Sequence, residues 1–461
     1  MKKSRSTKGR AATAAHEQNN VVKEKVQFLF LVGETKQKPF DYFRFNYHNR
    51  FFEQAEAAAD EVVVTSWNNL VVIEGHVFAR RGFILKNGQE IQITAPHLVR
   101  PDYVYEHKND VDSPSTEVNA HNVDVMSYLI KHDVISSNNA CGMTITNKYA
   151  LHLRNTVWKK GYLSFYSVMT YVGKWYLEEC FQYAESQGIK VSRPRTRLRG
   201  KAALINELPE LVTTGPIIVK PYLDANSRGI HVIDRTNCES VIRELEANGD
   251  QWYVAQEFIS DSVLYKGAHK ADLRFLVGVF SWEPLKFTMY GRGAPRISNK
   301  VYNANETPDR EACITVVSMQ SGQIDHNITT DEYLDGIEED KELLFKKIEK
   351  EIGNALSAIW VGRHILDNFL MPDERAENTV LLLSFDIILR YTETGIQPFI
   401  LETGFAPGLY RSSYIENSEV FNKILDTTYQ QFFRDVRQHA EEQAKALDSP
   451  VLAVSLPQDA G

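Results

Sequence analysis

Short apolar runs alternate with helical spacing in the first third of the chain. Residues 26–32 form an apolar run that ends at Gly33, residues 52–59 have helical spacing, and residues 61–64 are mostly β-branched. This order predicts a strand, a helix and a second strand. The same alternation predicts strand ends near residues 98–105 and 134–136, with a helix over 123–132 between them. Such a pattern is typical of an α/β unit.

Aromatic residues are concentrated in one stretch, residues 155–185, at a spacing close to that of a helix. Aromatic rings can stack on nucleic-acid bases, but a nucleic-acid surface also needs a clustered positive field. Basic residues are sparse in this stretch, and the whole chain is acidic. We therefore predict a helical stretch whose aromatic stripe faces the core or an interface.

The second half of the chain predicts strands separated by turns and one long helix. Strands are expected at 216–220, 231–234, 252–259, 273–280 and 285–290, and a short helix at 240–247. Residues 338–361 repeat apolar positions at helical spacing, with Lys and Glu on the other face. Two apolar runs, 380–389 and 398–401, are expected to be buried adjacent strands.

Length and composition indicate a globular chain with more than one core. The chain has 461 residues, which suggests two or three packed units. A hydrophobic fraction of 43% excludes a mainly disordered or fibrous chain. The apolar runs are far shorter than the roughly 20 residues of a membrane helix. The four Cys form no C-x-x-C pair and no cluster with His. We expect no membrane partner, no disulfide framework and no zinc site, in a cytoplasmic setting.

The two ends of the chain have the composition of solvated tails. Residues 1–24 are basic and carry no apolar face, which favours a disordered tail over a targeting signal. Residues 437–461 begin as a charged helix-like segment and end in a tail that contains Pro and Gly.

Several common catalytic and binding motifs are absent from the sequence. None of the 13 His has a metal-binding spacing with an acid nearby, and no Ser sits in G-x-S-x-G. No G-x-x-x-x-G-K-[ST] motif opens a helix. A nucleic-acid partner is not expected, because Lys+Arg 52 against Asp+Glu 60 gives a net charge of −8.

A first candidate binding element is the hairpin around Lys220. An apolar strand, residues 217–219, delivers Lys220; a loop with Ser227 and Gly229 follows, and a strand returns at 231–233. Loop N–H groups bind anionic oxygens, glycine permits close backbone approach, and the lysine adds a point charge. An ordinary β-turn with a surface lysine has the same composition, so the hairpin alone leaves both interpretations open.

A second candidate is a strand with three charges on one face. Strand alternation places Lys270, Asp272 and Arg274 on the same face, and Arg296 follows in the next predicted strand region. Three charges are costly to bury unless a charged ligand meets them. An exposed strand face would carry the same pattern at little cost, so this alternative also stays open.

A third candidate is a pair of carboxylates, Asp386 and Glu402, on the two neighbouring apolar runs. A carboxylate within or just beyond such a run needs a partner. Two hard oxygen ligands on adjacent strands suit Mg²⁺ that bridges nucleotide phosphates. The alternative for either residue alone is a salt-bridged structural acid.

The order of these clusters resembles the ATP-grasp superfamily, in which two α+β lobes hold ATP between them. The nearest likeness is to tubulin tyrosine ligase and its relatives. Residues 145–151, with Lys148, resemble the helix before the small lobe, and residues 256–259 resemble the adenine hinge. Residues 270–274 are similar to the Lys-x-Asp-hydrophobic-Arg strand of these ligases, and Arg296 with Tyr302 to their substrate loop. The resemblance covers about residues 145–410.

The resemblance implies an α+β ATP-grasp fold with six segments. They are a basic tail at 1–24, an α/β pre-ATP-grasp domain on the substrate side at 25–145, an aromatic-rich helical connector at 146–214, a small lobe with the phosphate loop at 215–262, a large lobe with the metal site at 263–436, and a C-terminal helix and tail at 437–461.

The resemblance also implies an activity, an ATP-dependent carboxylate–amine ligase that forms an amide through an acyl phosphate. ATP and Mg²⁺ would be its cofactors, with Arg274 and Arg296 on the transferring phosphoryl group and Asp386 and Glu402 on the metal. The residues that would bind the nucleotide are Lys148, Lys220, Ser227, Gly229, Gln256, Glu257, Phe258, Ile259, Lys270 and Asp272.

One position departs from the family pattern and keeps three functions open. Such ligases usually carry Glu-hydrophobic-Asn, whose Glu and Asn hold magnesium, whereas this chain reads Glu402-Thr403-Gly404. A ligand must come from water or from Thr403, or it is lost. The acidic net charge favours a small amino acid or peptide substrate. The alternatives are a ligase for a protein C-terminal tail, of the tubulin type, and an ATP-binding module without catalysis.

Overall fold

The computed structural model describes most of the chain, in segments. They are residues 27–31, 49–65, 69–73, 76–99, 103–106, 135–137, 156–158, 162–163, 174–221, 229–249, 252–315, 327–362, 379–405 and 419–448. The helix expected over 123–132 and the segments 1–24 and 145–151 lie outside the described residues. No helix in the described segments is long and apolar enough to span a membrane.

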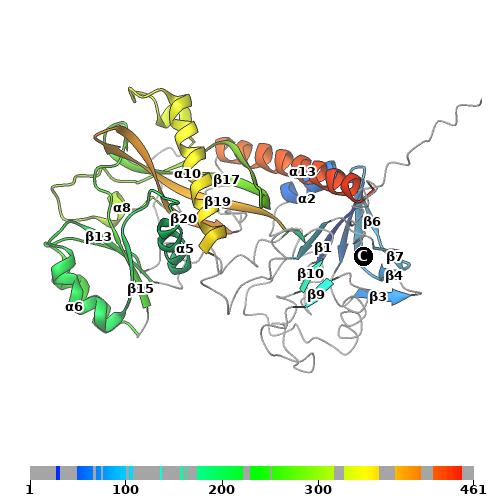
Figure 1. Cartoon of the computed structure of the whole chain (residues 1–461), viewed down its shortest axis with the longest axis horizontal. Coiled ribbons are helices and arrows are strands. Elements are labelled where there is room, and N and C mark those ends of the chain that lie inside the picture. The colour runs from blue at the N-terminus through cyan, green and yellow to red at the C-terminus, as the bar shows by residue number, and fades with distance from the viewer. Residues whose placement is uncertain are drawn as a thin grey trace, which may run out of the picture.

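Four long strands form the centre of the molecule (Figure 1). They are β17 (His269–Trp282), β18 (Leu285–Ile297), β19 (Thr379–Thr392) and β20 (Gly395–Phe405). All are antiparallel, in the order β18-β17-β19-β20. The two apolar runs of the sequence are therefore adjacent strands, as predicted. Strands β17 and β18 form one hairpin, and β19 and β20 form another. The β19–β20 turn ends at Gly395, whose φ of 103° favours glycine.

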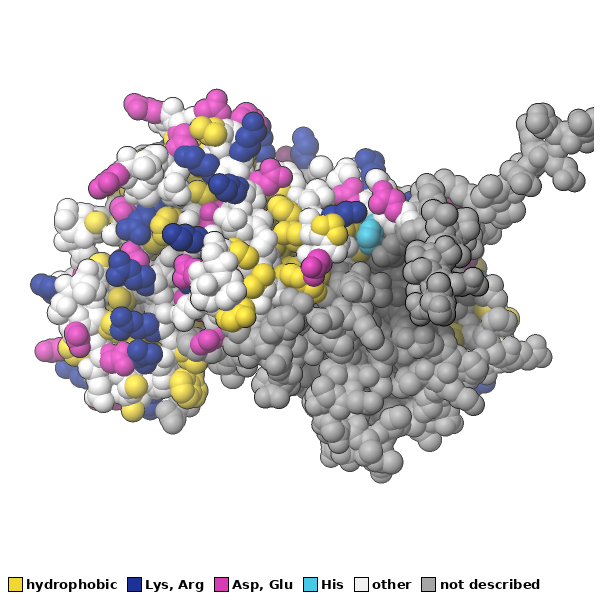
Figure 2. All heavy atoms as spheres, viewed as in Figure 1, with side chains coloured by type: hydrophobic (Ala, Val, Ile, Leu, Met, Phe, Trp, Pro, Cys, Tyr) yellow, Lys and Arg dark blue, Asp and Glu magenta, His cyan; other side chains and the backbone are white. Residues whose placement is uncertain are grey.

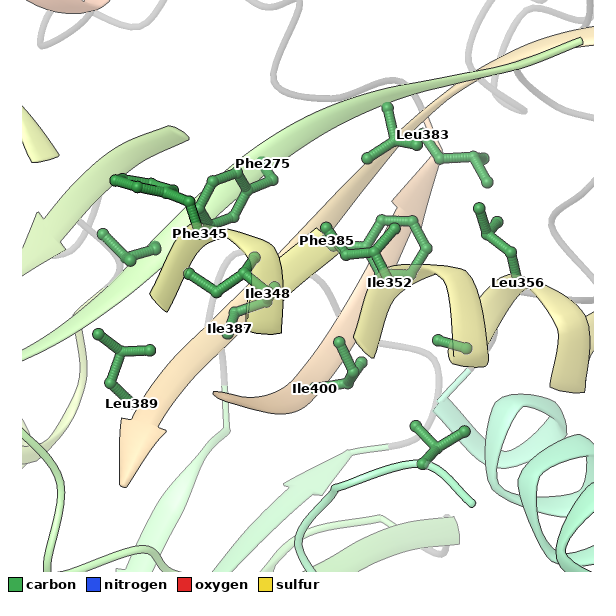
Figure 3. Close-up of a cluster of buried hydrophobic side chains, with 14 of the residues drawn as sticks. Phe275, Phe345, Ile348, Ile352, Leu356, Leu383, Phe385, Ile387, Leu389 and Ile400 are labelled. Carbon is green, nitrogen blue, oxygen red and sulfur yellow. The ribbon is translucent and has the colours of Figure 1, made fainter. Parts of the chain in front are cut away.

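One face of this central sheet is a continuous apolar core. Alternate residues of β17 and β19, such as Phe275 and Phe385, point to this face and are fully buried. Helix α10 (Lys341–Gly362) lays Ile348 and Ile352 on them, as Figure 3 shows. Helix α5 (Lys174–Ser186) packs against α10. The helix predicted at 338–361 is thus confirmed, and its apolar stripe explains its position.

The opposite face of the sheet is divided between apolar and charged residues. Leu276 and Leu382 pack under the C-terminal helix α13 (Glu419–Asp448), which contributes Phe432 and Phe433. Farther along the same strands this face carries charged residues instead. Helix α13 is continuous from Glu419 to Asp448, so the boundary expected at 436 falls inside it.

A second, smaller sheet forms the lobe at the left of Figure 1. Its order is β12-β15-β13-β14, with β12 Thr196–Gly200, β15 Trp252–Glu257, β13 Ile217–Pro221 and β14 His231–Ile233. Helices α6 (Lys201–Leu211) and α7 (Cys238–Ala247) cover one face through a cluster that includes Leu204, Leu245 and Tyr253. The predicted strands and the helix near 240–247 are confirmed.

The N-terminal part adds strands to the far side of the central sheet. Strand β1 (Gln27–Leu31) pairs in parallel with β2 (Glu61–Thr65) and β8 (Tyr103–Glu106), and α2 (Asn49–Ala58) lies between β1 and β2 in the chain. The predicted strand–helix–strand unit is confirmed. The remaining short elements are β3 Leu70–Ile73, β4 His76–Ala79, β5 Phe83–Lys86, β6 Gln89–Gln92, β7 His97–Leu98, β9 Ile135–Ser137, β16 Leu264–Tyr265, α8 Arg310–Cys313 and α9 Thr330–Tyr333.

The helical prediction for residues 155–185 is wrong in its first part. Residues Thr156–Trp158 form β10 and Tyr162–Leu163 form β11, and among the described residues of this stretch the helical segment is Lys174–Ser186. Strand β11 pairs in parallel with β8 and β19, which are distant in sequence. Local periodicity carries no information about such pairing. Within the helical part, Leu177 and Phe181 do face the core.

Mixed helices and strands in separately covered sheets confirm the expected α+β class. The two sheets also bring distant segments to one place: β13 and β15 of the small sheet lie beside the charged half of the central sheet. That charged half contains most of the candidate residues.

Candidate active site

A row of charged residues crosses the central sheet because of its strand register. Asp272 on β17 is paired with Arg296 on β18, and Arg274 on β17 is paired with Asp386 on β19. Asp386 is in turn paired with Glu402 on β20. Residues paired directly across strands point to the same face. The second and third candidate clusters of the sequence therefore lie together on one face.

A β-bulge turns Glu402 to this face. Ile400 pairs with Ile387 and is buried in the apolar core, whereas Glu402 pairs with Asp386, so Leu401 is the extra residue of the bulge. Uninterrupted alternation would have placed Ile400 and Glu402 on one face. Bulges re-aim side chains in this way and occur often beside active sites.

Two arginines hold the carboxylate of Asp386. Arg274 binds it in a bidentate manner, with Nε 2.8 Å from Oδ1 and Nη2 2.9 Å from Oδ2. Arg296 Nη2 lies 2.8 Å from Oδ2, and its Nε donates to Asp272 Oδ1 at 2.6 Å. Thr315 Oγ1 donates to Asp272 Oδ2. The result is a continuous chain of charge-assisted hydrogen bonds across three strands.

The two buried aspartates differ in how strongly they are held ionised. Burial alone would raise the pKa of Asp386, but Arg274 and Arg296 outweigh it and hold that pKa well below its usual range. For Asp272, burial and the neighbouring Asp386 raise the pKa despite the contact with Arg296. Asp272 and Lys270 are 4% and 1% exposed, so the alternative of an exposed strand face is wrong.

Lys220 reaches the same place from the small sheet. It ends strand β13 and is buried, and burial lowers its pKa although the carboxylates of Glu402 and Asp386 act in the opposite direction. It has no hydrogen bond or ion pair to any described residue. Lys174, at the start of α5, is a second cation whose charge acts on Lys220, and no motif in the sequence predicts this role. Charges from both sheets thus converge.

Strand β15 presents one of its predicted nucleotide-binding residues, Gln256, to the side of Lys220. Lys220 pairs with Val254 and Ile218 pairs with Gln256, so Gln256 shares the face of Lys220; its Nε2 donates to Thr196 Oγ1 at 2.9 Å. The side chain of Glu257 points the other way and is held by Arg390 at 3.1 Å. The side chain of Glu257 is therefore not on the side of Lys220, where the sequence predicts a nucleotide-binding role for it.

Lys270 anchors the end of the hinge. Its Nζ donates to Ser262 Oγ at 2.9 Å and to the carbonyl of Ile259, and lies 4.5 Å from the ring of Phe258 and 4.4 Å from that of Tyr302. Burial lowers its pKa to about 8. These contacts make Lys270 a residue that positions the hinge segment 256–259.

The phosphate-loop prediction is only partly within the described residues. Gly229 has φ +63°, and a Cβ there would lie 2.7 Å from Pro221 Cγ, so this position requires glycine. Lys148 and Ser227 lie outside the described residues.

The donor set on the charged face fits a hard divalent cation that also binds phosphates. Asp386 and Glu402 face each other across β19 and β20, and Glu402 has no hydrogen bond or ion pair within the described residues. In the segments the structure describes, no group of three or more His, Cys, Asp or Glu side chains is arranged so that it could hold a metal ion by itself. Mg²⁺ is commonly held by one or two carboxylates plus substrate phosphates and water, so two carboxylates suffice. Thr403 is not a ligand candidate, because it pairs with Phe385 on the opposite, apolar face.

Comparison with known proteins identifies the relatives of this chain. Residues 176–442 match the model of the tubulin-tyrosine ligase family. Probable tubulin polyglutamylase ttll-9 of Caenorhabditis elegans is 23% identical over 220 residues, which are 45% of this chain and 50% of the relative. Human probable tubulin polyglutamylase TTLL2 is 23% identical over 197 residues, which are 39% of this chain and 31% of the relative. Mouse probable tubulin polyglutamylase TTLL9 is 26% identical over 187 residues, which are 38% of this chain and 37% of the relative.

The matches cover these relatives only in part, since the chain spans about half or less of the length of each. Among solved structures, this chain aligns with the C-terminal domain of K. lactis Pby1, an ATP-grasp enzyme interacting with the mRNA decapping enzyme Dcp2. The alignment covers 89% of this chain and 92% of the Pby1 domain. The TM-score is 0.45 at 13% identity, and a likeness at that level carries no argument by itself. The family model covers more than half of the chain, and the chain therefore belongs to the tubulin-tyrosine ligase family.

Proposed function

We propose that this chain is an ATP-dependent ligase that joins an amino acid to a carboxylate on a protein tail through an amide bond. The observation that carries the proposal is the meeting of Arg274, Asp386 and Glu402 on the central sheet with Lys220 from the small sheet. Cations and carboxylates from two lobes around one point are what binding of a metal–triphosphate requires.

The arginines have hydrogen-bonding capacity left for an anion. Each guanidinium has five N–H donors, and Nη1 of Arg274 and of Arg296 has no partner among the described residues. Both side chains are fixed by Asp386, so little side-chain entropy is lost when a phosphoryl group binds. The buried ammonium of Lys220 likewise lacks a partner in the described segments and would gain one from a phosphate oxygen.

The proposed reaction has two steps. An oxygen of the substrate carboxylate attacks the γ-phosphorus of ATP, and the bond to the β-phosphate oxygen breaks to release ADP. The nitrogen of the amine then attacks the acyl carbon, inorganic phosphate leaves, and the nitrogen loses a proton. Arg274, Arg296 and Lys220 stabilise the negative charge on the phosphoryl oxygens and hold them in place. Mg²⁺ held by Asp386 and Glu402 would neutralise phosphate charge in the bound nucleotide.

A protein tail is the better-supported acceptor. The relatives are named probable tubulin polyglutamylases. The net charge of −8 argues against attraction of an acidic tail, but charge is unevenly distributed. Residues 190–201 contain six basic residues and no acid, and Arg195 and Arg197 are exposed and unpaired among the described residues. Lys and Arg side chains gather on the visible face of the small-sheet lobe (Figure 2). Such a local field attracts an acidic segment.

The experiment is an incorporation assay. The protein is incubated with Mg²⁺-ATP, labelled amino acids and either intact tubulin or tubulin whose acidic C-terminal tails have been removed by protease. We expect label in intact tubulin only, and none with Arg274→Ala. Phosphate release with free amino acids and no label in protein would instead support the small-substrate ligase.

A second candidate function, an ATP-binding module without catalysis, is favoured by Gly404, where a metal-ligating side chain is missing. Calorimetry with a non-hydrolysable ATP analogue separates it from a ligase. A ligase binds the analogue more tightly with Mg²⁺ than with EDTA, whereas a module that has lost the metal site binds equally in both.

A further inference from the structure

The residue pair next to Asp386 and Glu402 on the charged face is Ser384 and Gly404. Ser384 lies two residues before Asp386 on β19, and Gly404 two residues after Glu402 on β20, and the two are directly paired. Residues two apart on a strand share a face. The four positions therefore form one patch, whose side-chain oxygens come from Asp386, Glu402 and Ser384.

The hydroxyl of Ser384 occupies the space into which a side chain at position 404 would extend. A Cβ built on Gly404 would lie 2.5 Å from Ser384 Oγ, a distance that real Cβ atoms do not show. The absence of a side chain at Gly404 thus leaves room for the Ser384 hydroxyl. With any larger residue at 404, Ser384 would have to move. No positive φ is recorded at Gly404, so backbone conformation is not the reason for the glycine.

The Ser384 hydroxyl is buried and poorly satisfied. The side chain is 1% exposed, and its Oγ donates one long hydrogen bond, 3.3 Å, to the carbonyl of Gly404. No described residue donates to it, so both lone pairs of the oxygen are open. A buried hydroxyl oxygen that receives no hydrogen bond is costly compared with alanine, which would fill this position equally well in an apolar environment.

We propose that Ser384 supplies the oxygen donor that position 404 lacks, so that β19 rather than β20 completes the metal site. The inference rests on the proposed function, because it concerns the cation that accompanies the nucleotide. Three hard oxygen donors, two carboxylates and one hydroxyl, match the preference of Mg²⁺ and Mn²⁺.

The test measures metal binding rather than turnover. Mn²⁺ is titrated into the full chain with a non-hydrolysable ATP analogue, and free Mn²⁺ is followed by its electron paramagnetic resonance signal. For Ser384→Ala we expect Mn²⁺ affinity to fall about tenfold or more. The matched control is Thr403→Val, which removes the neighbouring buried hydroxyl, itself without a partner, from the opposite face. This control should bind Mn²⁺ like the wild type. Equal affinity in wild type and Ser384→Ala would overturn the inference.

A second variant covers the case in which Ser384→Ala does not fold. Ser384→Cys keeps the size of the side chain but prefers soft metals, so Mn²⁺ binding should weaken while Cd²⁺ binds with a new thiolate-to-metal ultraviolet band. The wild type is the reference for this band, and its described cysteines 180, 238 and 313 are all buried. Absence of the band in a folded variant with bound nucleotide would contradict direct participation.

A swap of the two residues completes the design. Gly404→Asn alone should lower the melting temperature, because its Cβ collides with Ser384 Oγ, whereas S384G/G404N should fold and recover Mn²⁺ binding from the other strand. A wild type that binds neither analogue nor Mn²⁺ would defeat the proposed function itself. A wild type that binds both, with Ser384→Ala unchanged, would defeat only the role of Ser384.

Discussion

On β17 and β19, alternate residues point to opposite faces of the central sheet, and the two sets differ in chemistry. Phe275, Phe385 and Ile387 enter the apolar core under α10. Their direct sequence neighbours Arg274 and Asp386 face the other side of the sheet. The apolar face gains free energy from burial regardless of any ligand. The charged face is expensive to bury and is stable only because its carboxylates and guanidiniums pair.

We interpret the apolar face as the one that stabilises the fold and the charged face as the one that the proposed function uses. Three cations, Arg274, Arg296 and Lys220, lie near three carboxylates, Asp272, Asp386 and Glu402, and Lys174 adds a further positive charge. These charges are paired unevenly: Asp386 is held by two arginines, whereas Lys220 and Glu402 lack partners in the described segments. Substitutions on the two faces should therefore separate stability from binding.

Arg274→Ala should have the largest effect, on the binding face. Loss of a fixed cation at a phosphoryl group costs about 10³-fold in turnover, which we expect in kcat for ATP-dependent amide formation. The matched control is Arg292→Ala on β18, whose arginine likewise forms ion pairs, with Asp331 and Glu342, but is 42% exposed. Equal losses in both variants would show that the position on the charged face is irrelevant.

Ile352→Ala tests the folding face. The residue is fully buried in the core between α10 and the sheet, and its truncation should lower the free energy of unfolding by about 3 kcal/mol. Binding of an ATP analogue per folded molecule should stay the same. Chemical denaturation and calorimetry on one preparation measure both, and a large loss of affinity at full folding would contradict the separation of the two faces.

The stability of the hinge anchor should depend on pH. Lys270 titrates in the folded protein with a pKa of about 8 and in the unfolded chain near its ordinary value, so the unfolded state binds more protons between these values. Below about pH 8 burial of this charge lowers the free energy of unfolding by its full amount. The loss becomes smaller as the pH rises towards about 10.5. Relative to Lys270→Met, the wild type should gain about 3 kcal/mol across this window, measured by urea denaturation. A constant difference would show that the ammonium is well solvated.

Lys220→Met should have the smallest effect on stability, and this effect should be an increase. Burial lowers the pKa of Lys220, so the folded state holds this proton less tightly than the unfolded state and the charge costs stability at neutral pH. We expect the unliganded variant to be more stable than the wild type and to lose the thermal shift that Mg²⁺ and an ATP analogue produce. A destabilised variant that still responds to the nucleotide would place Lys220 among structural residues.

Much of this arrangement follows from local sequence. Period-two alternation on residues 270–274 and the apolar runs at 380–389 and 398–401 correctly predict strands. The partnership of Arg274 with Asp386 does not follow, because it depends on a register between residues 112 positions apart. The bulge at Leu401, which turns Glu402 to the site, leaves no mark in the sequence that alternation alone detects.

Other features were missed for equally specific reasons. Helix α6 contains Pro209 and buries only Leu204 and Leu208, so its apolar stripe is too weak to recognise. Strands β10 and β11 span three and two residues and exist through distant partners. The matching of Gly404 to Ser384 is visible only when the two strands are paired. Pairing across strands, rather than propensity, thus determines the site.

The most direct measurement is a crystal structure of the chain with Mg²⁺ and a non-hydrolysable ATP analogue. The account predicts that the triphosphate lies between Lys220 of the small sheet and the Arg274–Asp386–Glu402 row, with the metal on Asp386 and Glu402. A nucleotide bound with its phosphates away from that row, or with Asp386 still closed by both arginines and no metal beside it, would contradict the account.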